Sequence, residues 1–163
     1  MKKFLVCLGL FAFATSVATG QGSAGKPPKE DTHKFNKAEY FQGTTTGQKK
    51  AGSTVKGTLF FDSETKHVNF LQESGSPAMT FKYDAIKTIT YEKASKPRMA
   101  EAVLISPLFL LSPSKKHYMT FQYTDDGGES NYAIIRLDKN NAREAVACAE
   151  AQTRKRVEQT EEK

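Results

Sequence analysis

From residue 54 onward, the hydrophobic and polar positions of this chain repeat with the short period of β-structure. Apolar and polar side chains alternate over residues 79–83, and the alternation returns over 118–123. An alternation with a period of two is typical of a strand that buries one face. Other segments are rich in β-branched and aromatic residues, which favour strands. Together these patterns predict strands at residues 55–61, 67–72, 79–83, 86–91, 118–123 and 131–137.

Turn-forming residues separate the predicted strands. Residues 62–66 and 73–77 are rich in Asp, Ser, Gly or Pro, which interrupt regular structure. Residues 125–128 read Asp-Asp-Gly-Gly, and glycine tolerates the positive φ angles that tight hairpins need. The strands on either side of residues 125–128 therefore form the clearest predicted hairpin.

Toward the C-terminus the period lengthens to that of a helix, over about residues 140–158. Asn140 or Asn141 is suited to cap this helix, because an Asn side chain accepts a hydrogen bond from a free backbone N–H. One face of the helix carries mostly small residues at helical spacing, namely Ala142, Ala145, Val146, Ala149, Thr153 and Val157. Small side chains let the helix pack closely on the sheet.

A small, bent antiparallel sheet followed by one amphipathic helix resembles the pleckstrin-homology (PH) superfold, including bacterial PH-like and GRAM-like domains. Residues 57–61 followed by 68–70 look like the opening hairpin of these domains. Residues 81–86 look like their aromatic-x-x-Ile turn, and 137–139 like the end of the last strand. The resemblance implies a mainly β barrel or sandwich of about six to seven strands, capped by one C-terminal amphipathic helix.

The fold resemblance says less about function, because one fold hosts many functions. The stretches around residues 115–118 and 154–158 also resemble uncharacterised secreted bacterial proteins, which lends no activity.

Ahead of the domain, the chain opens with the three-part pattern of a secretory signal peptide. Lys2 and Lys3 precede an apolar run over residues 4–14, and Ala18 and Gly20 place small side chains before a cleavage site. The alternative is an uncleaved anchor, but the run is shorter than the roughly 20 residues of a membrane-spanning helix. We therefore expect cleavage near Gly20 and export to a periplasmic or extracellular compartment.

Residues 21–50 are rich in Gly, Lys, Thr and Gln, with Phe35, Tyr40 and Phe41 as their large apolar side chains. Such a segment buries too little surface to offset the entropy lost on ordering. A short contact of residues 37–42 with the domain is the alternative for that part, and the rest is expected to act as a tether. The predicted organisation is a signal peptide at 1–20, a flexible linker at 21–50, a PH-like domain at 51–159 and a disordered tail at 160–163.

The charge of the chain argues against a nucleic-acid partner. Without the two leader lysines, its 24 basic residues become 22, against 18 acidic residues, and the two signs are interspersed. A nucleic-acid-binding protein more often carries a basic stripe or block. The one dense basic cluster, at residues 154–156, suits the C-terminal end of the predicted helix.

The cysteines and histidines indicate no disulfide, metal site or cofactor. Only Cys148 would remain after cleavage, so no internal disulfide can form. We expect a half-buried thiol on the helix flank, with pairing between two chains as the alternative. His33, His67 and His117 are far apart and lack acidic or cysteine partners at ligand spacing.

No catalytic constellation is recognisable, so we expect a protein that is not an enzyme. A general base must lie within hydrogen-bond reach of its nucleophile, and no histidine is placed to do so in the sequence. The chain lacks the nucleophile-elbow, zinc-protease and phosphate-loop motifs. The nucleophiles considered are Ser63, Ser106, Ser112 and Cys148.

Phosphoinositide binding, the activity most often associated with PH domains, needs Lys and Arg around the first hairpin. If residues 57–61 and 68–70 are that hairpin, its loop at 62–66 carries two acids and one base. Phosphate recognition by this loop is therefore not expected.

Residues 102–111 are apolar nearly throughout and follow no clean period. Pro107 excludes an uninterrupted helix or a central strand. One interpretation packs the segment into the barrel as two short strands, or as a strand and a loop. The other exposes it as a contact for a membrane, a partner or a second copy. The candidate interaction surface is Leu108, Phe109, Leu110, Leu111, Lys115 and Lys116.

The sequence thus favours an exported, non-enzymatic, PH-like module that binds a protein at a sheet edge or at residues 102–111. Strand addition to the edge is one mode, and a homodimer is one candidate complex. The alternative is peripheral attachment to an anionic membrane, with Lys115 and Lys116 meeting the headgroups. A small hydrolase is the second alternative.

Overall fold

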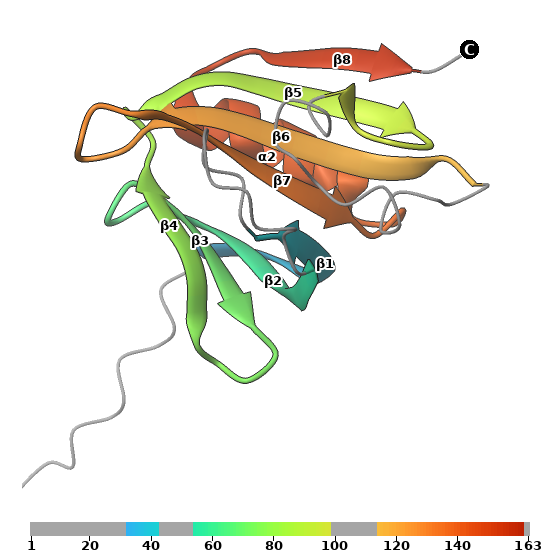
Figure 1. The fold of residues 1–163 in the computed structure, drawn as a ribbon, viewed down its shortest axis with the longest axis horizontal. Helices are drawn as coiled ribbons and strands as arrows, with labels where there is room; N and C mark the ends of the chain where they lie inside the picture. The colour runs from blue at the N-terminus through green and yellow to red at the C-terminus, as the bar shows by residue number, and fades with distance from the viewer. Residues whose placement is uncertain (1–31, 43–53, 99–113, 162–163) are drawn as a thin grey trace, which may run out of the picture.

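The computed structural model describes residues 32–42, 54–98 and 114–161 (Figure 1). Within these ranges, no helix is long and apolar enough to cross a membrane. The predicted signal peptide and the apolar segment at 102–111 lie outside the described residues, as do Ser106 and Ser112.

The described residues form one sheet in the spatial order β4-β3-β2-β1-β7-β6-β5-β8. Its strands are β1 (Thr32–Phe41), β2 (Thr54–Asp62), β3 (His67–Gln72), β4 (Pro77–Lys82), β5 (Ile86–Ala94), β6 (Lys116–Thr124), β7 (Ser130–Leu137) and β8 (Val157–Glu161). Neighbouring strands run antiparallel, apart from the parallel pair β5–β8. One helix, α2 (Ala142–Thr153), follows β7. The predicted mainly β fold with one C-terminal helix is confirmed, and β2 to β7 match the six predicted strands.

The sheet bends around one hydrophobic core that α2 covers (Figure 1). Phe61 of β2 and Phe121 of β6 are both fully buried, and their ring centroids lie 6.2 Å apart. Ala145 and Ala149 of α2 are also fully buried, as the small-residue face predicts. A bent sheet with one C-terminal helix is consistent with the PH-like resemblance.

The predicted linker at 21–50 is wrong where the structure can test it, because residues 32–41 form the central strand β1. β1 pairs with β2 on one side and with β7 on the other. Phe35, Tyr40 and Phe41 are each less than a tenth exposed, so their burial stabilises the strand that orders them. The folded domain therefore includes residues N-terminal to its predicted start at residue 51.

The opening hairpin of the sheet is also different from the one expected. β2 and β3 contain residues 57–61 and 68–70, but β1 precedes them, so they form the second hairpin. The loop at 62–66, judged unsuited to phosphate, therefore joins β2 to β3. The loop between β1 and β2 lies outside the described residues.

The C-terminal boundary needs a similar correction. The helix ends at Thr153, and Arg154 adopts a left-handed backbone with φ of 57°. Val157 then begins β8, a strand where the sequence predicted the end of the helix and the start of a disordered tail. The Asn141 side chain makes no cap hydrogen bond, and its Nδ2 donates instead to the Asn36 carbonyl oxygen at 2.9 Å.

The hairpin between β6 and β7 matches its prediction. Asp125 Oδ1 accepts hydrogen bonds from the backbone N–H groups of Gly127 and Glu129, and Gly128 has φ of 85°. Asp125 Oδ2 accepts another from Asn131 Nδ2 at 2.7 Å. The Asp125 carboxylate therefore stabilises the turn.

Two adjacent phenylalanines test which face of β2 supports the core. Phe61→Ala should lower the free energy of unfolding by about 3–5 kcal/mol, because it removes a fully buried ring that packs against Phe35 and Tyr83. Phe60→Ala is the matched control on the opposite face, and should cost about 1 kcal/mol or less. Urea denaturation measures both, and equal losses would contradict the assigned core face.

Candidate binding cleft

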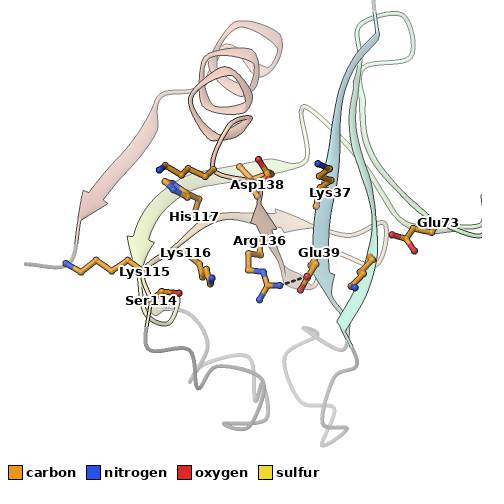
Figure 2. Close-up of a pocket in the computed structure, with 13 residues that line it drawn as sticks. Lys37, Glu39, Glu73, Ser114, Lys115, Lys116, His117, Arg136 and Asp138 are labelled. Atoms are coloured by element: carbon orange, nitrogen blue, oxygen red, sulfur yellow. Dashed lines mark hydrogen bonds and ion pairs between the residues drawn. The ribbon is translucent and has the colours of Figure 1, made fainter.

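An open cleft lies where β1 separates from β7 (Figure 2). Of the ten residues of β1, Glu39, Tyr40 and Phe41 pair with β7, whereas the pairing with β2 runs from Thr32 to Phe41. The cleft has a volume of about 610 Å³. It is lined by Lys37, Ala38, Glu39, Lys56, Glu73, Ser114, Lys115, Lys116, His117, Arg136, Leu137, Asp138 and Lys139.

A β-bulge forms part of one wall of this cleft, and a glycine lies beside that wall on β2. The pairing of β1 with β2 shifts between Phe35 and Ala38, and Lys37 within the bulge has φ of 56°, which is strained for a residue with a side chain. On β2, a Cβ at Gly57 would lie 1.9 Å from the carbonyl oxygen of Leu71, so this approach of β2 to β3 requires glycine. The bulge brings Lys37 and Ala38 to the cleft, and Gly57 follows Lys56, which also lines it.

The cleft is positively charged. Among the described residues, six basic and three acidic side chains line it, which gives a net charge of +3 with the histidine neutral. The basic residues are Lys37, Lys56, Lys115, Lys116, Arg136 and Lys139, and the acids are Glu39, Glu73 and Asp138. Clustered like charges focus a potential that attracts oppositely charged ligands.

An ion pair crosses the junction between β1 and β7. Arg136 donates through Nη2 to Glu39 Oε1, and the two residues face each other in the strand register. Their side chains are 30% and 18% exposed, so both contact solvent from the cleft. Beside them, burial raises the pKa of Tyr118, while the Arg136 charge acts against that shift. Tyr118 therefore stays neutral beside the ion pair.

Two of the residues predicted as an interaction surface lie in this cleft, namely Lys115 and Lys116. The other four, Leu108, Phe109, Leu110 and Leu111, are outside the described residues. Sequence reasoning missed Lys37, Lys56, Arg136 and Lys139. They belong to separate segments, and no local spacing indicates that the fold brings them together.

His117 and His67 each contact a neighbouring polar group. His117 Nδ1 lies 2.6 Å from the Tyr91 hydroxyl oxygen, and the two rings stack. His67 Nδ1 lies 2.6 Å from the carbonyl oxygen of Thr65. In the part of the chain that the structure describes, no three His, Cys, Asp or Glu side chains gather as a metal would require.

Ser63 and Cys148 are the two candidate nucleophiles that the structure describes. Ser63 Oγ donates to Gln152 Oε1 at 2.9 Å. Cys148 is free and buried, and burial, with a smaller contribution from the Glu144 carboxylate, raises the pKa of its thiol to about 12. Because the thiolate is the nucleophilic form, Cys148 is a structural residue of the core.

Comparison with known proteins assigns no family. No family model and no curated protein matches the chain. Among solved structures, it is similar to a chain described as "Structure of the Spt16D Pob3N heterodimer", with 9% identity and a TM-score of 0.45. The match covers 81% of this chain and 55% of that one, so the chain spans about half the length of this relative. A likeness of this strength identifies neither a family nor a function.

The burial of Cys148 predicts a low reactivity. With a pKa of about 12, its native thiol should react with iodoacetamide at pH 8 at least about a thousandfold more slowly than an exposed cysteine. Denaturation in urea should restore the ordinary rate. Peptide mass mapping follows Cys148 separately from Cys7, and rapid labelling of the folded protein would show that the thiol is exposed.

Proposed function

We propose that this domain is a non-catalytic binding module that holds an acidic segment of a partner protein in the basic cleft. The observation that carries the proposal is the gathering of six cations around one open cleft of about 610 Å³. These cations lie on β1 and β2, at the start of β6 and at the C-terminal end of β7, so they come from several strands instead of forming a single row.

The mixture of cations suits a flexible acidic peptide. Lysine is a flexible point charge, whereas arginine offers a planar fork of donors that matches a carboxylate. Five of the six bases are lysines, and Lys37, Lys56 and Lys139 are exposed. Such a surface attracts successive Asp and Glu side chains without demanding one fixed geometry. Complementary charge of this kind mainly supports encounter rate and partner choice.

The chemistry of the described residues supports a role in binding over catalysis. Cys148 is protonated, and burial raises the pKa of Tyr123 to about 12 and that of Tyr83 as well. Groups held in their neutral form by burial stabilise a core and supply neither nucleophile nor base near neutral pH. The PH-like resemblance and the leader pattern support the further proposal that this is a PH-like module acting after export.

Binding of an acidic probe tests the proposal. Fluorescein-labelled oligoglutamate should bind the purified protein, as measured by fluorescence anisotropy, and oligoglutamine should not. The affinity should fall as ionic strength rises from about 0.01 M to about 0.15 M, because the Debye length shortens from about 30 Å to about 8 Å. Oligoglutamine binding as tightly as oligoglutamate would contradict an electrostatic cleft.

Charge reversal locates the binding site. Lys116→Glu and Lys139→Glu should each weaken oligoglutamate binding about tenfold, since each replaces attraction with repulsion inside the cleft. Lys87→Glu is the matched control, because Lys87 is exposed on β5 and does not line the cleft. Equal weakening by all three variants would show that net charge, and no particular site, governs binding.

Vesicle sedimentation separates a protein ligand from a membrane. Vesicles of phosphatidylcholine and phosphatidylserine should pellet little of the protein if the cleft takes acidic peptides. Strong pelleting that Lys116→Glu abolishes, together with no binding of oligoglutamate, would replace the proposal with peripheral membrane attachment.

A further inference from the structure

We propose that Glu39 competes with the acidic groups of a ligand for Arg136. Because the Glu39 carboxylate already pairs with Arg136, it sets the density of negative charge that a ligand must carry to bind in the cleft. This inference rests on the proposed function of the cleft. It assigns to Glu39 a selectivity role that acts through Arg136, in addition to the contribution of the ion pair to the sheet.

The strand register places Glu39 between two cations. Glu39 on β1 faces Arg136 on β7 and Lys56 on β2. Residues directly opposite on adjacent strands point to the same face of a sheet. The Glu39 carboxylate is therefore the negative member of a cross-strand row whose two neighbours are positive.

The contact with Glu39 engages Arg136, the one arginine among the described residues that line the cleft. Arginine presents five N–H donors in a rigid fork, and this geometry binds a carboxylate more specifically than lysine does. The ion pair with Glu39 uses Nη2 of that fork. A carboxylate from a ligand must therefore share Arg136 with Glu39 or displace it.

The partial exposure of the pair makes this competition accessible to a ligand. Arg136 is 30% exposed and Glu39 is 18% exposed, and both line the cleft. Burial strengthens charge interactions relative to open water, so the fixed carboxylate both neutralises Arg136 and repels an incoming acid. A ligand with a single acidic group therefore gains little binding free energy here, whereas a ligand with several consecutive acidic residues also contacts the surrounding lysines.

Removal of the Glu39 charge tests the inference. Glu39→Gln keeps an oxygen that accepts a hydrogen bond from Arg136 but removes the negative charge. It should bind oligoglutamate about tenfold more tightly than the wild type, and should also raise the affinity for shorter acidic peptides such as triglutamate. Glu39→Asp retains the negative charge and should therefore bind oligoglutamate less tightly than Glu39→Gln.

Glu129→Gln controls for net charge, because it makes the same change at the opposite end of β7, about 20 Å away along the strand. It should leave the affinity near that of the wild type. Thermal denaturation of each variant verifies that the fold is retained.

The outcomes separate this inference from the proposed function. If Glu39→Gln binds oligoglutamate more tightly than the wild type and Glu129→Gln does not, the result supports both the cleft and the competitor role of Glu39. The competitor role is also supported if Glu39→Gln binds while the wild type binds too weakly to measure. If the wild type binds oligoglutamate and Glu39→Gln binds it equally well or more weakly, the proposed binding cleft stands. The competitor role is then overturned, because Glu39 only orients Arg136. If neither protein binds an acidic peptide, both proposals fail.

Discussion

The structure depends on the short junction between β1 and β7. β1 joins the β2–β3–β4 part of the sheet to the part formed by β5 to β8, and it meets β7 through only its last three residues. Without this junction each part would expose an unpaired edge and half of a common core. In this antiparallel register Ala38 would face Leu137, where β7 ends, so the earlier residues of β1 extend beyond β7 and the cleft lies beside the junction.

The ion pair between Glu39 and Arg136 lies at that junction and lines the cleft that we propose as a binding site. The ion pair connects the two strands and gives Arg136 a negatively charged partner. Several lysines surround it, and their like charges repel one another. If the ion pair served only the stability of the sheet, the surrounding cations would contribute nothing to that stability. Their presence around an open cleft is the reason to infer a ligand that compensates the repulsion.

Periodicity predicted the strands and helix that follow a regular pattern, and it failed where two patterns compete. In β1 the residues facing the core are Phe35, Ala38 and Tyr40, and the bulge breaks their alternation. In β8, Val157 lies four residues after Thr153, so it also fits the helix period. The cleft was beyond sequence reasoning, because its cations come from separated segments that only the strand order brings together.

A two-dimensional NMR titration with oligoglutamate tests the central claim, that acidic ligands bind beside the β1–β7 junction, most directly. Backbone amide shifts should concentrate at Lys37, Lys56, Lys116, Arg136 and Lys139, and the β6–β7 turn should stay unchanged. Shifts concentrated along the β4 edge, or spread evenly over the surface lysines, would contradict it.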